Sequence, residues 1–274
     1  MIKKTSPGYK AVVSPYLLWS ILFVIAPMFF VAYYSFTGSD GAWTLENILA
    51  LGKYTPTFVR SIWHGLLATL ICLFLAFPLS YFISKTSANT QRTMVALVML
   101  PMWMNFLIRT YSWMTILQDT GLINSMLAKV GLGPFQMLNT RGAVILGMTY
   151  NFLPYMILPL YSVMSKLDQS VIEAAQDLGG NRYQVLRRVI IPLSMPGIAS
   201  GLTMVFVPSV STFYISQKLG GGSFDLIGDV IERQFQQAYN YNLGAAISLV
   251  LMVLILISMA FLNKYSDSGG GVVV

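Results

Sequence analysis

The sequence has 274 residues, of which 55% are apolar and only 10% are charged, and its formal net charge is +7. Soluble domains carry roughly 25% charged side chains, so this composition excludes an ordinary water-soluble globular protein. It predicts an all-α integral membrane protein, because a lipid-exposed backbone has to satisfy its own polar groups. The single cysteine, Cys72, excludes an intrachain disulfide.

Six stretches are long and apolar enough to cross a hydrocarbon core of about 30 Å as helices. In chain order they are Ser14–Phe36, Ser61–Ser84, Thr93–Leu117, Ala143–Ser165, Ile191–Ser216 and Leu243–Asn263. The first follows three lysines and lacks a small-residue cleavage site, so we expect a retained span and not a signal peptide. We expect one transmembrane domain over residues 1–263. The tail over 264–274 looks like low-complexity or artificially appended sequence.

Lysine and arginine are distributed unevenly between the connecting segments. With the N-terminus inside, ten of them share the cytoplasmic segments with four acids, and six share the outer segments with six acids. Positive loops tend to remain cytoplasmic, so both termini are predicted to lie inside an inner or plasma membrane; whether the cell also has an outer membrane stays open. This topology and phospholipid headgroups account for the basic charge, and nucleic acid is not an expected partner.

Prolines and glycines occur within the predicted spans. Two interpretations of the prolines stay open: membrane helices tolerate proline, or broken helices line a pathway. Gly197 and Gly201 form a G-x-x-x-G pair, which predicts a close helix contact. The prolines inside the spans are Pro27, Pro78, Pro101, Pro154, Pro159, Pro196 and Pro208.

One cytoplasmic loop, residues 166–190, is long, polar and patterned. Ser170 and Glu173 have the spacing of a capping box, which predicts a helix that begins at Ser170. Gly179 and Gly180 are expected to end that helix through positive φ, and Asn181 is expected to cap a second one.

Each of these two helices carries apolar residues at helical spacing. A small flat apolar face on the first is formed by Val171, Ala174, Ala175 and Leu178, beside Glu173 and Asp177. On the second, Val185, Leu186 and Val189 alternate with Arg182, Arg187 and Arg188, which is typical of a helix at the membrane boundary. Local patterning alone would make this loop a capped interfacial connection between two spans.

A longer pattern runs through the same loop: Glu173-Ala174-Ala175, three residues, Gly179, nine residues, then Val189-x-Ile191-Pro192. It resembles the cytoplasmic signature of binding-protein-dependent ABC import permeases, which has isoleucine and leucine where this chain has Val189 and Ile191. The resemblance implies a methionine-importer-like permease fold and a coupling helix that sits in a cleft on a separate ATPase. The residues then expected to couple to the ATPase are Ser170, Glu173, Ala174, Ala175, Asp177, Leu178, Gly179 and Pro192.

The resemblance also implies partners. They are an ABC ATPase dimer, a second homologous permease subunit, identical or not, and an extracytoplasmic substrate-binding protein. The chain has no G-x-x-x-x-G-K-[ST] phosphate loop, so ATP and Mg are expected on the ATPase and the chain itself is expected to be no enzyme. No cofactor or metal is expected in this chain.

Longer stretches such as LPMWMNFLIRTYSW and FYISQKLGGG are similar to spermidine/putrescine permeases, although permeases for iron(III), sulfate or other small solutes share the scaffold and stay open as alternatives. A polycation favours aromatic faces, oxygen acceptors and carboxylates along its route. The candidates in the spans are Trp103, Asn105, Tyr111, Trp113, Tyr150, Asn151, Tyr155, Ser209, Ser211, Thr212 and Tyr214. Those on the outer side are Asp119, Asp225, Asp229 and Glu232. For each aromatic, an interfacial belt or core packing is the alternative role.

Two intramembrane groups bear on other functions. Arg109 would repel a polyamine, so we expect it to pair with an outer-loop acid or with another subunit. An intramembrane serine protease is a remote alternative. Two observations count against it: the only histidine, His64, lies near the outer end of a span, and Gly197–Gly201 is one residue too long for a G-x-S-G motif. A secondary transporter would usually show mid-span acids, and none occurs.

Overall fold

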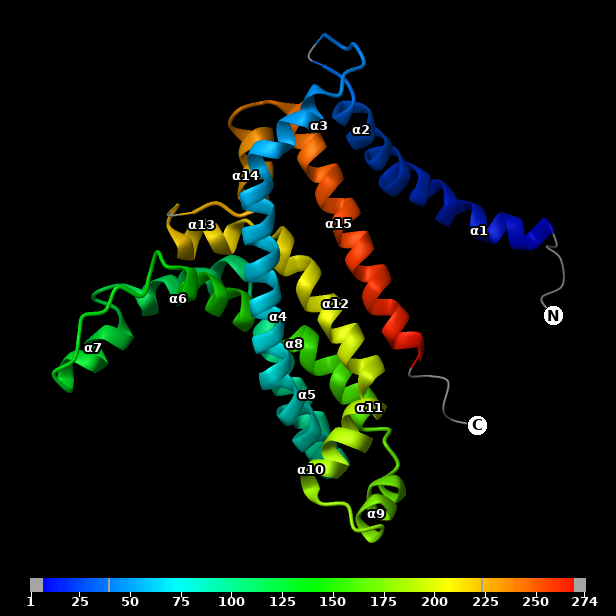
Figure 1. Cartoon of the computed structure of the whole chain (residues 1–274), viewed down its shortest axis with the longest axis vertical. Helices are drawn as coiled ribbons and strands as arrows, with labels where there is room; N and C mark the ends of the chain where they lie inside the picture. Colours follow the sequence, from blue (N-terminus) through cyan, green and yellow to red (C-terminus); the bar gives the residue numbers. More distant parts are fainter. Residues whose placement is uncertain (1–6, 39, 223, 269–274) are drawn as a thin grey trace. The chain divides into compact units, whose positions relative to one another are not determined.

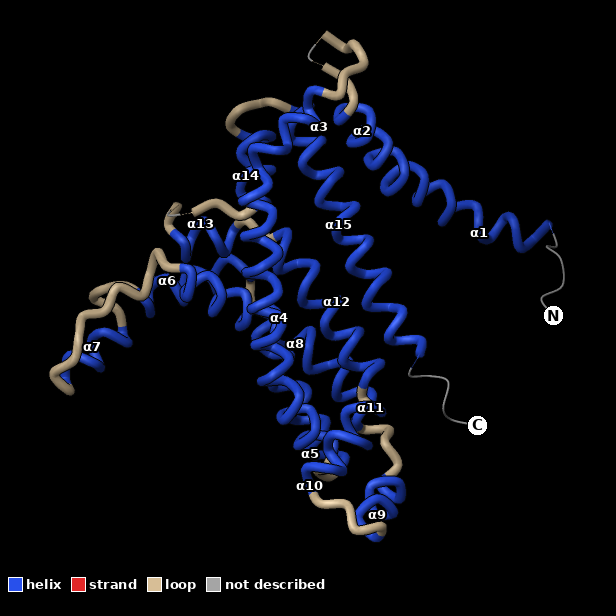
Figure 2. The backbone as a smooth tube through the Cα atoms, in the orientation of Figure 1, coloured by secondary structure: helices blue, strands red, loops and turns tan. Residues whose placement is uncertain are grey.

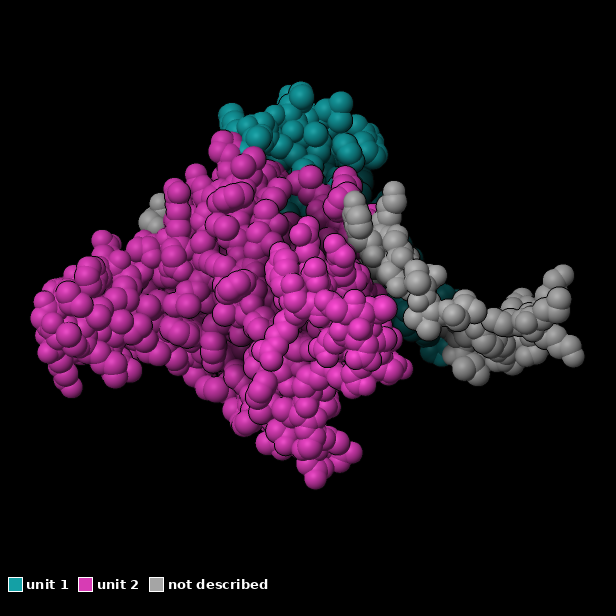
Figure 3. Space-filling model, turned by 60° about the horizontal axis from the view of Figure 1, so that its bottom comes forward, with its two compact units in different colours: residues 1–55, 230–253 teal, residues 56–229, 254–274 magenta. Residues whose placement is uncertain are grey.

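The computed structural model describes residues 7–38, 40–222 and 224–268 (Figure 1). Within those ranges the regular structure is helical, apart from one isolated bridge between Thr37 and Trp43, as Figure 2 shows in blue. The chain divides into two units, residues 1–55 with 230–253 and residues 56–229 with 254–274 (Figure 3).

The six predicted spans correspond to four long helices and two bent pairs. The four helices that are long and apolar enough to cross a membrane are Ser14–Ser35, Glu46–Ser84, Arg141–Met164 and Tyr241–Leu262. The third span is bent by 88° between Ala88–Trp103 and Phe106–Lys129. The fifth is bent by 66° between Arg182–Leu193 and Met195–Ser211.

The first unit holds the N-terminal span. Its elements are α1 (Pro7–Ser20), η1 (Ile21–Ile25), α2 (Ala26–Ser35), α3 (Glu46–Ala50) and η2 (Leu51–Tyr54), with parts of α14 (Ile227–Gln236) and α15 (Tyr241–Ser268). The Asn242 amide Nδ2 donates to the Thr37 carbonyl at 2.6 Å and ties α15 to the loop after α2. Because α15 continues to Ser268, it runs into the expected tail, of which residues 269–274 lie outside the described residues.

The second unit holds the second to fifth spans, the end of α15 and the patterned loop. Its elements are α4 (Thr55–Ser84), α5 (Ala88–Trp103), α6 (Phe106–Leu117), α7 (Leu122–Lys129), α8 (Arg141–Met164), α9 (Gln169–Asp177), α10 (Arg182–Val185), η3 (Leu186–Ile190), α11 (Ile191–Leu193), α12 (Met195–Ser211) and α13 (Tyr214–Gly220). Figure 1 shows α9 and α10 near the C-terminal end of α4, and α6 with α13 toward the other end of this unit. The patterned loop therefore lies well apart from α6 and α13 within unit 2.

The close contact predicted at Gly197 and Gly201 is confirmed, and its partner is α8. A Cβ at Gly197 would lie 2.9 Å from the Pro159 carbonyl oxygen, and one at Gly201 would lie 2.5 Å from the Met156 sulfur. Met156 itself is fully buried in the core. Small residues on α12 thus allow two backbones to approach where larger side chains would separate them.

Two of the prolines lie at helix breaks, and others lie inside unbroken helices. Pro101 precedes the α5–α6 break and its carbonyl accepts the Met104 N–H at 3.2 Å. Pro196 lies in the first turn of α12, directly after the bend at Ser194. Both positions fit the rule that proline removes a helical hydrogen bond and favours a break nearby. The span prolines that lie inside unbroken helices are Pro78, Pro154, Pro159 and Pro208.

Candidate coupling site and substrate route

The start of α9 differs from the prediction. Asp168, and not Ser170, is the N-cap residue: its Oδ1 accepts the Ser170 backbone N–H at 2.9 Å. The predicted capping box of Ser170 and Glu173 is therefore wrong. Both residue types suit an N-cap, and the carboxylate two residues earlier takes the free N–H instead. The bonds that Ser170 makes to this carboxyl, first from its backbone N–H and then from its hydroxyl, hold the pKa of Asp168 below its usual range.

The end of α9 depends on two glycines for different reasons. Gly179 has φ +84°, as predicted, and apart from its chain neighbours no described residue has an atom within 4 Å of where its Cβ would be. Gly180 does not have the predicted positive φ. It is needed because its own N–H bonds the Ala175 carbonyl at 3.1 Å, and a Cβ there would lie 2.5 Å from that oxygen.

Asn181 caps the second helix, as the sequence predicts. Its Oδ1 accepts the Gln184 N–H at 2.8 Å, and the Gln184 Oε1 accepts the Asn181 N–H at 2.9 Å. This reciprocal pair is a complete capping box, located one helix later than expected. The corner between α9 and α10 is consequently fixed on both sides.

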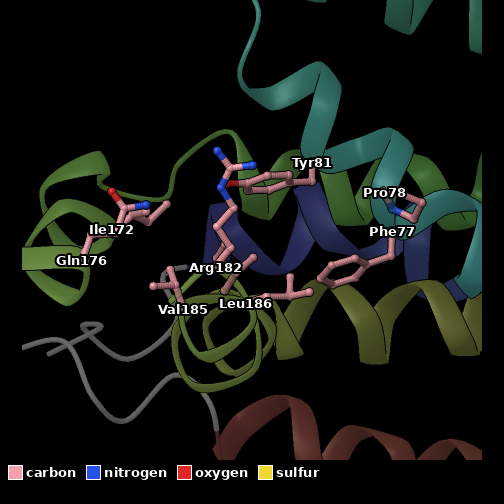
Figure 4. Close-up of a pocket in the computed structure, with 9 residues that line it drawn as sticks. Phe77, Pro78, Tyr81, Ile172, Gln176, Arg182, Val185 and Leu186 are labelled. Atoms are coloured by element: carbon pink, nitrogen blue, oxygen red, sulfur yellow. The ribbon is translucent and has the colours of Figure 1, made fainter. Parts of the chain in front are cut away.

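The inner side of this corner packs against α4. Ile172, Val185 and Ile190 are buried, and Phe77 and Tyr81 of α4 pack against them. A cavity of about 400 Å³ opens at this junction. It is lined by Phe77, Pro78, Tyr81, Ile172, Gln176, Arg182, Val185, Leu186 and Ile190, and in Figure 4 the Arg182 side chain extends toward Tyr81.

The outer side of α9 is uncovered. Val171 is 45% exposed and Leu178 is 90% exposed, and Ala174 lies between them on the same face. The adjoining acids, Glu173 and Asp177, are also exposed. A helix held rigidly on one side and bare on an apolar face is suited to contact a partner protein.

The second helix continues to α12 through a widened turn. The exposed Arg187 and Arg188 lie in η3, a π-helical segment that ends two residues before Pro192. Proline cannot donate a backbone N–H, which accounts for irregular hydrogen bonding just ahead of it. The bend at Ser194 then leads into α12, so the corner and the α12 helix are joined by η3, the three residues of α11 and Ser194.

On the candidate substrate route, the structure brings together two aromatic pairs. The rings of Tyr111 on α6 and Tyr214 on α13 meet edge to face with centroids 6.3 Å apart. Those of Trp113 and Tyr150 meet in the same way at 5.4 Å. Edge-to-face contacts at these separations are stabilising, and they leave ring faces available to a cation.

Other polar and aromatic candidates have mainly local contacts. Asn105 caps α6, its Oδ1 accepting the Leu107 N–H at 2.8 Å. Asn151 is buried and donates to the Gly147 carbonyl at 2.9 Å. The Ser211 hydroxyl donates to the Val207 carbonyl at 3.0 Å. The remaining ones are Trp103, which is 78% exposed, Tyr155, which packs on Phe152 at 6.4 Å, and Ser209 and Thr212, which are buried.

The outer acids differ in their surroundings. Asp229 is buried, and its oxygens accept the Ser216 hydroxyl and the Leu226 N–H, both at 2.8 Å. This carboxylate therefore holds α13, the following loop and α14 together and is not open to a passing solute. Asp119 is exposed, while Asp225 and Glu232 are half-buried.

His64 and Arg109 are both buried. The His64 Nδ1 lies 2.7 Å from the Arg60 carbonyl oxygen, and its ring stacks on Phe224 at 5.4 Å, so it has a packing role. The Nε and Nη1 atoms of Arg109 have no hydrogen-bond partner in the described part of the chain. The expected pairing with an outer-loop acid is thus not found there.

Known proteins resemble this chain over nearly its whole length. Residues 12–269 match the family described as "Binding-protein-dependent transport system inner membrane component". The chain belongs to this family. It is therefore a multi-pass membrane permease subunit of an ABC importer.

Two similar relatives of this permease are bacterial. The spermidine/putrescine transport system permease protein PotB of Haemophilus influenzae is 40% identical over 248 residues, which cover 86% of each chain. The protein of the same name from Escherichia coli is 37% identical over 245 residues, covering 86% of this chain and 89% of that one.

Solved structures confirm the permease fold. One is the bacterial alginate ABC transporter in complex with an alginate pentasaccharide-bound periplasmic protein, with a TM-score of 0.73, 22% identity and coverage of 96% of this chain and 95% of that chain. Another is the MetNI methionine ABC transporter, with a TM-score of 0.53, 18% identity and coverage of 78% and 96%. The predicted methionine-importer-like fold is confirmed.

Sequence reasoning missed one residue that contacts candidate residues of the route. Lys218 follows Tyr214 by four residues on α13, and its Nζ lies 5.8 Å from the Tyr214 ring centroid and 5.5 Å from that of Tyr111. The spacing from Tyr214 is a signal that was present in the sequence, since residues four apart are neighbours on a helix. The contact with Tyr111 required the fold.

Proposed function

We propose that this permease moves polyamines such as spermidine and putrescine inward, and that ATP hydrolysis on a separate subunit drives it through α9. The observation that carries the coupling role is the corner formed by α9 and α10. Its buried side is anchored on α4 by Ile172, Val185 and Ile190, while Val171 and Leu178 on its other side are uncovered. A rigid helix transmits force that a flexible loop would lose to conformational entropy.

Similarity to spermidine/putrescine permeases supports a polyamine as the substrate. The relatives named above are spermidine/putrescine permeases at 37–40% identity over most of their length. The paired tyrosines and the Trp113–Tyr150 pair add aromatic faces, which attract ammonium groups through their quadrupoles.

Three kinds of partner subunit would complete the proposed transporter. An ABC ATPase dimer would bind ATP and Mg and receive the exposed face of α9. A second, homologous permease chain would complete the route, and an extracytoplasmic binding protein would deliver the substrate. Both termini would lie in the cytoplasm, on the side where the basic loop residues Arg182, Arg187 and Arg188 meet anionic headgroups.

Uptake by the complete complex in liposomes tests this function. The expected result is ATP-dependent accumulation of labelled putrescine or spermidine, with no accumulation of iron(III) or sulfate. The isolated chain should neither hydrolyse ATP nor accumulate solute. Uptake of iron(III) or sulfate without polyamine uptake would overturn the substrate, and rapid uptake by the isolated chain would overturn the importer mechanism.

A further inference from the structure

Lys218 occupies an aromatic site on the proposed route. Its ammonium Nζ lies 5.5 Å from the Tyr111 ring centroid and 5.8 Å from the Tyr214 ring centroid, and both distances are within cation–π range. The two rings themselves are perpendicular within 5°, with an interplanar angle of 85°. One cation therefore contacts both rings of a built pair.

The pair is positioned by two helix breaks. Tyr111 lies on α6, which begins after the break at Asn105, and Tyr214 begins α13, three residues after α12 ends at Ser211. Phe106 packs against Tyr214 with ring centroids 5.8 Å apart and supports it from α6. The tyrosine pair is thus held by packing from its own elements and does not depend on Lys218 for its position.

The site can be reached from outside the protein. Tyr111 is 43% exposed, and Tyr214 and Lys218 are half-buried. In the described part of the chain, no carboxylate forms an ion pair with Lys218, whose ammonium is therefore free to leave the rings without breaking a salt bridge. Leaving costs the cation–π attraction, the hydrogen bond between the ammonium and the Tyr111 hydroxyl, and some change in hydration.

We propose that Tyr111 and Tyr214 form a subsite for one ammonium group of the substrate, and that Lys218 is a tethered occupant which that group displaces. This inference rests on the polyamine function proposed above. Two ammonium ions cannot share one pair of rings, because like charges at contact distance repel each other strongly. Entry of a substrate ammonium and departure of Lys218 therefore occur together.

The exchange suits transport better than a carboxylate site would. A buried carboxylate binds a polycation tightly and releases it slowly, whereas here one cation replaces another and the charge of the site stays constant. When the substrate moves on, the lysine returns to the rings. The tethered cation thus limits how long a polyamine stays at this subsite.

In the complete complex, substitution of Lys218 and substitution of either tyrosine should change the KM for putrescine in opposite directions. Lys218→Met removes the competitor and should lower the KM for putrescine about 2- to 30-fold, while Tyr111→Ala or Tyr214→Ala should raise it. Lys218→Arg keeps a cation on the rings and should keep the wild-type KM. Lys129→Met, at an exposed lysine near the end of α7, is the matched control and should change nothing. A KM that rises or stays unchanged in Lys218→Met overturns the proposal.

Displacement can be observed directly. Reductive ¹³C-methylation of the lysines keeps their charge, and the Lys218 methyl signal, assigned by its loss in Lys218→Arg, should be shifted upfield by the two rings. Putrescine added to the complex should return that signal to the position of an exposed lysine such as Lys129. A signal that putrescine leaves in place, in a complex that takes up putrescine, overturns the subsite and leaves the proposed function intact. A complex that takes up no polyamine overturns both.

Discussion

The guanidinium of Arg109 has few contacts for a charge in its position. Its side chain is 8% exposed, and the described residues offer it only the Phe106 ring, 6.0 Å from its Cζ. Breaking a buried ion pair leaves a charge whose desolvation is not compensated, at about 3–5 kcal/mol. We therefore expect the second permease subunit to supply a carboxylate to Arg109.

Arg109→Met should act in opposite directions on the isolated chain and on the complex. The isolated chain should melt at a higher temperature, because an unpaired buried charge is removed, and the permease pair should weaken by about 3 kcal/mol, because its acid loses a partner. Thermal melting in detergent and size-exclusion chromatography measure the two effects. Arg109→Lys should retain most of the pairing. Intact assembly together with improved polyamine uptake in Arg109→Ala would contradict this role.

Asp168 makes the first turn of α9 sensitive to acid. Its folded pKa is lowered, so the cap stabilises the helix at neutral pH, and this contribution is lost as pH falls below about 4, through the unfolded and then the folded pKa. Hydrogen exchange at the Ser170 amide, corrected for its intrinsic pH dependence, should accelerate in that range. Asp168→Asn caps nearly as well without titrating, so its exchange should be independent of pH there. Equal acid sensitivity in both proteins would exclude the cap as the cause.

At the scale of elements, local sequence rules predicted the corner between α9 and α10 but not the residues that anchor this corner to α4. The positive φ of Gly179 and the cap at Asn181 follow from residue type and position alone. The choice of Asp168 over Ser170 as N-cap does not, because both residue types suit the position. Ile172 was missed as a core residue because it lies off the regular apolar face of its helix. Its partners, Phe77 and Tyr81, come from a distant span that no local pattern predicts.

Ile172→Ala should loosen α9 from α4. Loss of a buried isoleucine side chain costs about 2–4 kcal/mol, and a loosened helix should let the ATPase hydrolyse ATP with less transport per ATP. Val171→Ala is the matched control: it removes an exposed side chain from the next position, so α9 should stay attached and only the affinity for the ATPase should fall. Hydrogen exchange over residues 169–177 and the ratio of uptake to hydrolysis separate the two. An Ile172→Ala protein with unchanged exchange would contradict the anchoring.

At the scale of the whole molecule, hydropathy predicted six spans because lipid imposes a length and a composition on every helix that crosses it. It could not show that the third and fifth are bent by 88° and 66°, because a bend depends on what packs beside a proline and not on apolar content. The tyrosine pair of the proposed route joins helices that begin after breaks. For that reason Tyr111 and Tyr214 could be named from the sequence as separate candidates, but their contact with Lys218 could not.

The proposed coupling depends on one step: the corner at Gly179 transmits work from the ATPase to the spans. Gly179→Asp and Gly179→Asn test it most directly, since both residue types tolerate positive φ and, apart from the chain neighbours, no described residue has an atom within 4 Å of the added Cβ. Only aspartate adds a charge that docking would have to desolvate. We predict that Gly179→Asn retains most polyamine uptake per ATP hydrolysed, and that Gly179→Asp loses it at least about tenfold while inserting normally. Uptake per ATP equal to wild type in Gly179→Asp would contradict the account.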